Sequence, residues 1–173
     1  MRAIVYLSVA LVPIIHNANA GDYFTLHPDA IISGDTWHQN NNTYRLYGVQ
    51  ACLRNTFYTD KNGQQQDCGI ASADGLAAFI ADTTPSCSVI IAAAEIKYTM
   101  CYATVGSTAV DLGTALIASG YAFASLNSQG LPYVPAYSVA EKSAAEKRKG
   151  LWAFTDVQHP AIFLSQHAKA QKQ

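Results

Sequence analysis

Charge is scarce in this sequence of 173 residues, because Asp, Glu, Lys and Arg together make up only 13 % and the formal net charge is −1. With no excess of basic residues, the chain builds no strong positive field that would recruit nucleic acid or anionic membrane. Beyond residue 20, no apolar run reaches the roughly 18 residues of a membrane span. Hydrophobic residues make up 50 % of the chain, which excludes a disordered protein.

Short motifs of several enzyme classes are also missing. The sequence contains no Gly-x-Ser-x-Gly, Walker or dinucleotide-binding fingerprint. Its histidines share no metal-ligand spacing, which argues against a zinc site. There is no internal repeat and no low-complexity segment. The length suits a single globular domain.

The first 20 residues have the pattern of a secretory signal peptide. A basic start at Arg2 precedes an uncharged apolar run, and Ala18-Asn19-Ala20 matches the small-x-small cleavage pattern. The alternative is a membrane anchor, although the run is short for a bilayer and no basic cluster follows it. We therefore expect an exported protein, periplasmic or secreted, with no membrane span in the mature chain. The expected organisation is a signal peptide at 1–20, a domain at 21–155 and a C-terminal tail at 156–173.

Periodicity and turn residues predict strands mostly before helices. Strands are expected at 23–32, 44–49, 87–92 and 98–105, with the last two forming a hairpin. Helices are expected near 69–81, 111–119 and 138–149. Asp111 is the expected N-cap of the second helix, and Ser138 with Glu141 forms a capping box for the third. This order indicates an α+β fold with an antiparallel sheet, and a small five-stranded barrel with three packed helices fits it.

Four cysteines allow three disulfide pairings. A hairpin centred near Ala94 places Cys87 directly opposite Cys101. We therefore predict the disulfide Cys87–Cys101 together with Cys52–Cys68, which closes a polar loop. The alternative is four free thiols, which an exported protein in an oxidising compartment disfavours.

Four blocks of the sequence, in order and spacing, resemble the staphylococcal-nuclease-like (thermonuclease) family. The blocks are Ser33-Gly34-Asp35-Thr36, Tyr44-Arg45-Leu46-Tyr47-Gly48-Val49, Asp111-Leu112-Gly113-Thr114-Ala115-Leu116-Ile117-Ala118-Ser119-Gly120, and Ala140-Glu141 through Gly150-Leu151-Trp152. The resemblance covers residues 30–152. It implies an OB-fold five-stranded β-barrel with three helices, and calcium-dependent hydrolysis of DNA and RNA phosphodiesters.

The resemblance assigns roles to two side chains. Asp35 matches the family's first calcium-binding aspartate, and Arg45 matches its first phosphate-binding arginine. The residues themselves leave another interpretation open for each. Asp35 follows Gly34 and suits an ordinary turn, and Arg45 suits a strand arginine that pairs with an acid.

Three other family positions hold residues that cannot perform the family's chemistry. Gln50 replaces the second calcium-binding aspartate, Leu53 replaces the glutamate general base, and Met100 stands where the second phosphate-binding arginine is expected. Their loss predicts calcium-dependent cleavage that is absent or strongly impaired. The open alternative is rescue by charged residues of the long loop, namely Asp60, Asp67 and Arg54.

Two classes of function follow from this pattern. The first is an exported nuclease-family protein that still acts on nucleic acid, with Ca²⁺ as the cofactor implied by the resemblance. The second is a non-catalytic OB-fold binding or scaffold module of the cell envelope, with a protein, polysaccharide or nucleic acid as its ligand. Nine of the 10 tyrosines lie beyond the expected signal peptide and could stack nucleic-acid bases, although half-exposed tyrosines are also common in ordinary strands.

Overall fold

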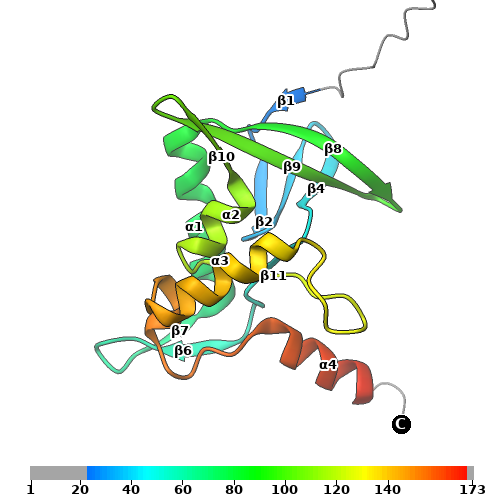
Figure 1. Cartoon of the computed structure of the whole chain (residues 1–173). Coiled ribbons are helices and arrows are strands. Elements are labelled where there is room, and N and C mark those ends of the chain that lie inside the picture. Colours follow the sequence, from blue (N-terminus) through cyan, green and yellow to red (C-terminus); the bar gives the residue numbers. More distant parts are fainter. Residues whose placement is uncertain (1–22, 171–173) are drawn as a thin grey trace, which may run out of the picture.

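The structure of the chain, a computed structural model, describes residues 23–170, so the expected signal peptide at 1–20 lies outside the described residues. Within this range the chain is α+β, with a curled mixed β-sheet and four α-helices (Figure 1), which confirms the α+β part of the predicted fold class. Among the described residues, no helix has the length and apolar character that crossing a bilayer requires.

The large sheet has seven strands in the order β1-β8-β9-β4-β3-β2, with β10 also pairing with β9. Their bounds are β1 Tyr23–Thr25, β2 Ala30–Ser33, β3 Thr36–Gln39, β4 Asn42–Leu46, β8 Ser86–Ala93, β9 Ile96–Val105 and β10 Thr108–Asp111. Neighbouring strands are antiparallel except β4 and β9, which are parallel. The expected antiparallel sheet is wrong at this pair, because the long connection between β4 and β9 leaves room for a parallel crossover.

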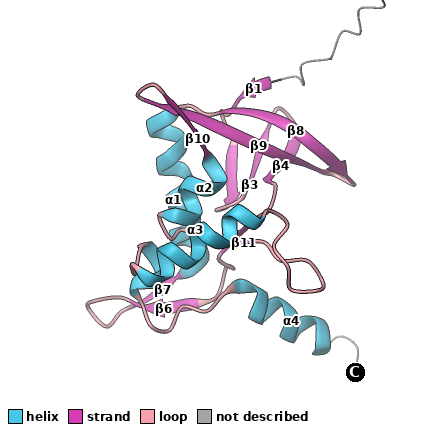
Figure 2. Cartoon of the chain, in the orientation of Figure 1, coloured by secondary structure: helices cyan, strands magenta, loops and turns pink. Residues whose placement is uncertain are grey.

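The remaining four strands form two small sheets of two strands each. β5 (Val49–Ala51) pairs with β11 (Ala122–Ala124), and β6 (Phe57–Thr59) pairs with β7 (Gln65–Asp67). The β6–β7 hairpin occupies a segment whose composition predicts only a loop. Its turn is held by Asp60, whose carboxylate accepts hydrogen bonds from the backbone N–H groups of Asn62 and Gln64. Figure 2 shows this hairpin at the end of the molecule away from the large sheet.

Three of the four helices lie where the sequence predicts them. They are α1 (Cys68–Thr83), α2 (Leu112–Ala118) and α3 (Pro135–Glu146). Asp111 is the N-cap of α2, and its carboxylate accepts a 2.7 Å bond from the Thr114 N–H. The Ser138 capping box is wrong, because Pro135 starts α3 earlier and Glu141 accepts from the Ala124 N–H instead.

The fourth helix, α4 (Pro160–Ala170), lies in the segment that the sequence predicts only as a tail. A single turn of 3₁₀-helix, Gly150–Ala153, precedes it. His159 sits just before α4 and accepts a hydrogen bond from the Ala161 N–H through Nδ1. Its Nε2 lies 3.4 Å from a carboxylate oxygen of Glu141, which links the start of α4 to α3.

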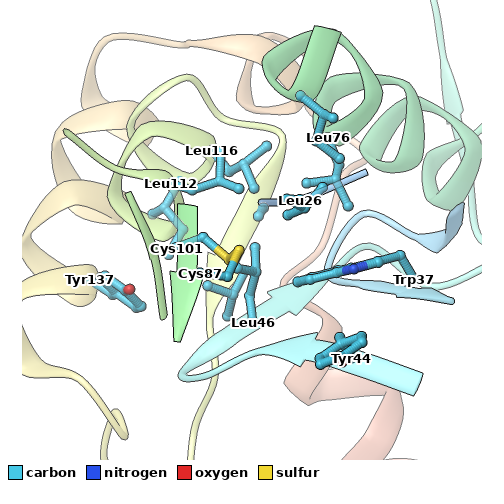
Figure 3. Packing of buried hydrophobic residues seen from close by; sticks show 14 of the residues in the cluster. Leu26, Trp37, Tyr44, Leu46, Leu76, Cys87, Cys101, Leu112, Leu116 and Tyr137 are labelled. Atoms are coloured by element: carbon cyan, nitrogen blue, oxygen red, sulfur yellow. A yellow bond between two sulfur atoms is a disulfide. The ribbon is translucent and has the colours of Figure 1, made fainter. Parts of the chain in front are cut away.

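The main core lies between the inner face of the large sheet and helices α1 and α2. Figure 3 shows it as a cluster that includes Leu26, Trp37, Tyr44, Leu46, Leu76, Leu112 and Leu116. Side chains alternate between the two faces of a strand. Because Tyr44 and Leu46 of β4 point into the core, Arg45 between them is turned outward.

Both disulfides form at the predicted pairs. Cys87 and Cys101 face each other across β8 and β9 with Cα atoms 4.0 Å apart, and Cys52 and Cys68 have Cα atoms 5.5 Å apart. The predicted hairpin register holds as far as Val89 opposite Thr99, and a bulge between Val89 and Ile91 then shifts the pairing by one residue. As a result Ile91 lies opposite Tyr98, and both line the pocket described below.

Candidate functional site

The turn between β2 and β3 brings Asp35 and Arg45 together. Arg45 lies opposite Thr36 in the β3–β4 ladder, so its side chain reaches the residue just before β3. Arg45 Nη2 donates to Asp35 Oδ2 at 2.9 Å. The Asp35 side chain is only 3 % exposed, whereas that of Arg45 is 27 % exposed. The pair is therefore a buried carboxylate covered by a guanidinium that still meets solvent.

All the acceptor capacity of Asp35 is used inside the protein. Oδ1 accepts from the hydroxyls of Ser33 at 2.6 Å and Thr36 at 2.7 Å. Oδ2 accepts from Arg45 and from the Ala51 N–H at 3.0 Å. An ionised carboxylate offers about four lone-pair sites, and here four donors occupy them.

Gln50 completes the cluster of polar side chains. Its Oε1 accepts from the same Arg45 nitrogen at 3.0 Å, and its Nε2 donates to the Ala51 carbonyl. Asp35, Arg45 and Gln50, three of the positions that the resemblance singles out, therefore lie together in the structure. The other guanidinium nitrogens of Arg45, Nη1 and Nε, have no hydrogen-bond partner within residues 23–170.

A pocket of about 370 Å³ opens beside this cluster. Its aromatic lining comes from three separate elements: Tyr47 follows β4, Tyr98 belongs to β9, and Tyr133 precedes α3. The Tyr47 and Tyr133 rings meet edge to face with centroids 6.1 Å apart. Arg45, Gln50 and Ser125 contribute further polar residues to the lining. We refer to this site as the tyrosine pocket.

Gly48 shapes one wall of the tyrosine pocket. It has φ of +73°, a conformation that favours glycine, at the turn between β4 and β5. A Cβ added there would lie 2.6 Å from Val134 Cγ2, so the turn packs directly against the residue before α3. This close approach sets Tyr47 and Tyr133 on the same side of the pocket.

The remaining positions named by the resemblance lie outside this pocket. Met100 pairs with Ser88 across β8 and β9, and Leu53 follows β5 with its carbonyl bonded to Thr56. Neither lines the tyrosine pocket. The structure therefore joins three of the five family positions at the site and separates two from it.

The charged loop residues that could rescue catalysis are engaged elsewhere. Asp60 holds its own turn, and Asp67 caps α1 by accepting from the Ile70 N–H. Arg54 is exposed and does not line the tyrosine pocket. Of these three residues, none reaches the cluster around Asp35.

The oxygen atoms at this site do not fit a calcium ion. Calcium requires six to eight oxygen ligands, usually with several carboxylates. Asp35 has no free acceptor site, the Gln50 oxygen faces Arg45, and a guanidinium occupies the position beside both. Among residues 23–170, no group of three or more His, Cys, Asp or Glu side chains is arranged to hold a metal ion.

Tyr133 and Tyr98 are functional candidates that sequence reasoning does not single out. The sequence shows many tyrosines but not which of them converge. Tyr98 reaches the pocket because parallel pairing places it opposite Arg45. Tyr133 reaches it through the long segment after β11, where its N–H bonds the Ser125 carbonyl. Neither relationship leaves a local signal in the sequence.

No family model matches this chain, and no curated protein matches it.

Proposed function

We propose that this protein is a non-hydrolysing, exported member of the staphylococcal-nuclease-like group that binds single-stranded nucleic acid. One nucleotide enters the tyrosine pocket, where its base stacks on tyrosine rings and its phosphate meets Arg45. The observation that carries the proposal is the lining of the pocket, which combines three tyrosines and an arginine with no carboxylate or imidazole.

The aromatic lining supports a flat ring as ligand. Tyr98 is half-buried and Tyr133 is 52 % exposed, so both present ring surface to an incoming group. Stacking of a base on an aromatic side chain tolerates any base, because every base has a π-face. Leu126 and Ile91 add apolar surface at the rim.

Arg45 supports an anionic group next to that ring. One of its nitrogens is committed to Asp35 and Gln50, while the N–H groups on Nη1 and Nε remain for a ligand. Guanidinium N–H groups suit phosphate oxygens in geometry and charge. The Asp35 carboxylate holds the arginine in place and offsets its charge, so we expect modest affinity.

The absence of hydrolysis follows from the groups that face the ligand. Cleavage needs a group to activate water and groups to stabilise the charge that develops on the phosphate. The pocket lining supplies one partly committed arginine and no base. Asp35 cannot act as the base, since its oxygens already accept four hydrogen bonds.

The fold and the cysteines support the assignment to this group. The curled sheet with helices packed on it is compatible with an OB-like barrel, the fold that the resemblance implies. Two disulfides suit an oxidising compartment, and a signal peptide at residues 1–20 would deliver the chain there. We therefore place the protein in the periplasm or outside the cell.

The test is binding and cleavage of a fluorescent single-stranded oligonucleotide by the chain that begins at Gly21. We expect a saturable rise in anisotropy and an intact oligonucleotide after prolonged incubation with calcium or with chelator. Tyr133→Ala removes one stacking surface, so affinity should fall about 5- to 100-fold. Tyr23→Ala is the matched control, because Tyr23 is 66 % exposed and lies on β1 outside the pocket.

Each other outcome contradicts a stated part of the proposal. Chelator-sensitive cleavage would show that the protein is a working nuclease. Binding that Tyr133→Ala and Tyr23→Ala weaken equally would remove the tyrosine pocket as the site. Binding of a neutral oligosaccharide at Tyr133, with no binding of the oligonucleotide, would favour an envelope polysaccharide as ligand.

A further inference from the structure

A second pocket lies between α1 and the segments that flank it. Its volume is about 360 Å³, and it shares no lining residue with the tyrosine pocket. Two tyrosines form its sides: Tyr58 comes from β6, and Tyr121 comes from the residue before β11. Its floor is α1, where small residues, Ala71, Gly75 and Ala78, lie beside the larger Phe79. We call this site the α1 pocket.

The lining of the α1 pocket carries a negative charge and no positive charge. Asp74 is the only charged residue in its lining. Helix α1 carries two charged side chains in all, Asp74 and Asp82, and no basic residue. Within residues 23–170 Asp74 forms neither an ion pair nor a side-chain hydrogen bond. The exposed carboxylate of Asp74, in a pocket that Tyr58 and Tyr121 also line, is therefore free to meet a cation.

The walls of the α1 pocket are held in place before any ligand binds. Tyr58 packs against Phe154, with ring centroids 4.5 Å apart, and also packs against the buried cluster that contains the Cys52–Cys68 disulfide. Tyr121 rests on the backbone of Gly75, where an added Cβ would lie 2.7 Å from Tyr121 Cβ. The carbonyl of Tyr121 also accepts a 2.5 Å bond from the Ser72 hydroxyl.

The electrostatics agree with this geometry. Partial burial raises the pKa of Tyr58, and Tyr121, Asp60 and Asp74 raise it further. Tyr58 thus keeps its proton and presents a neutral ring. The electron-rich face of such a ring attracts a cation, and a guanidinium can stack on it while its N–H groups reach a carboxylate.

We propose that the α1 pocket binds the guanidinium of an arginine side chain on a partner protein. The guanidinium lies between the rings of Tyr58 and Tyr121 and donates hydrogen bonds to Asp74. Charge complementarity carries the assignment, because the lining offers one unpaired carboxylate, three aromatic side chains (Tyr58, Phe79 and Tyr121) and no cation. The site is independent of the tyrosine pocket and of what that pocket binds.

The experiment titrates the isotope-labelled protein with acetyl-Gly-Arg-Gly-amide and follows backbone amide shifts by NMR. We expect saturable shifts at Asp74, Gly75 and Tyr121, with a dissociation constant on the order of millimolar. The same peptide with citrulline, which is neutral and has nearly the same shape, should cause no saturable shifts. The lysine peptide should bind more weakly than the arginine peptide.

Two variants locate the interaction on the α1 pocket. Asp74→Asn removes the charge and should weaken binding about two- to five-fold. Asp82→Asn removes a matched charge from the same helix outside the pocket and should leave binding unchanged. Tyr121→Leu keeps apolar bulk over Gly75 and should weaken binding about two- to five-fold.

The proposal is overturned by any of four results. These are no saturable shift with the arginine peptide, equal binding of the citrulline peptide, tighter binding of the lysine peptide, and equal losses in Asp74→Asn and Asp82→Asn. Each variant's amide spectrum reports whether its fold is intact. The proposal therefore stays testable even if Tyr121→Leu fails to fold, because Asp74 and Asp82 are exposed.

Discussion

Arg45 covers the carboxylate of Asp35 with a 2.9 Å hydrogen bond between Nη2 and Oδ2, and the same nitrogen also reaches Gln50. The carboxylate is buried and the guanidinium partly exposed, so the arginine both satisfies a buried charge and faces a pocket. The resemblance to nucleases gives these residues separate jobs, one on calcium and one on phosphate. In this chain Asp35 and Arg45 form one hydrogen-bonded ion pair. The first two predictions concern this pair.

Arg45→Ala should destabilise the protein strongly. It leaves the Asp35 charge buried without its partner, which costs about 3 kcal/mol in the free energy of unfolding. Urea denaturation at neutral pH measures this loss. Arg54→Ala is the control, since Arg54 is an exposed arginine outside the cluster and should change stability by less than about 0.5 kcal/mol. Equal stability of the two variants would show that the ion pair contributes little.

Calcium should leave the stability of the protein unchanged. A ligand that binds only the folded state raises the melting temperature with its concentration, and a saturating ligand at about 100 times its dissociation constant adds about 2.7 kcal/mol. Because Asp35 has no free acceptor, we expect equal melting temperatures in calcium and in chelator. A rise specific to calcium and absent from Asp35→Asn would show that the cluster rearranges to bind the ion.

Binding of single-stranded nucleic acid should depend only weakly on salt. Each neutralised phosphate contributes a slope of about −0.7 in the logarithm of affinity against the logarithm of salt concentration. Arg45 is the only cation in the lining of the tyrosine pocket, so the expected slope is about −0.7. Tyr133→Ala should weaken binding without changing this slope. A several-fold steeper slope would indicate an extended basic surface in place of the pocket.

The Cys52–Cys68 disulfide should protect the β6–β7 hairpin from proteolysis. The bridge ties the residues on either side of the hairpin, which otherwise joins the rest of the fold through few buried side chains. Cys52→Ala with Cys68→Ala should lower the free energy of unfolding by about 3 kcal/mol and speed cleavage by trypsin after Lys61. Cleavage at the parent rate would mean that the hairpin needs no bridge.

The free energy of unfolding should decrease at alkaline pH, partly because Tyr137 ionises more readily in the unfolded chain than in the folded one. Burial raises the pKa of this tyrosine above its ordinary value of 10.0, and the nearby Asp111 carboxylate raises it further. Between pH 10.0 and the folded-state pKa, the unfolded chain has lost a proton that the folded chain keeps, so stability falls as pH rises. Urea denaturation from about pH 9 to about pH 11 should show a shallower decline for Tyr137→Phe. An equal decline would remove Tyr137 as its cause.

The features that the sequence determined are those with a local physical cause. Alternation of Tyr44, Arg45 and Leu46 specifies a strand with one buried face. Asp111 caps α2 because its side chain lies within reach of the Thr114 N–H, three residues away. The Cys87–Cys101 pair follows from a hairpin whose strands are adjacent in the sequence. Each relationship depends on a few neighbouring residues or on one short connection.

The features that only the tertiary structure decided depend on segments distant in the chain. Parallel pairing of β4 with β9 sets Tyr98 beside Arg45, and the path after β11 brings Tyr133 to the same pocket. The donors that converge on Asp35 from Arg45 and Ala51 likewise come from outside the turn that holds it. A polar side chain binds whichever partner the packed fold brings within hydrogen-bond distance, and no local pattern encodes that partner.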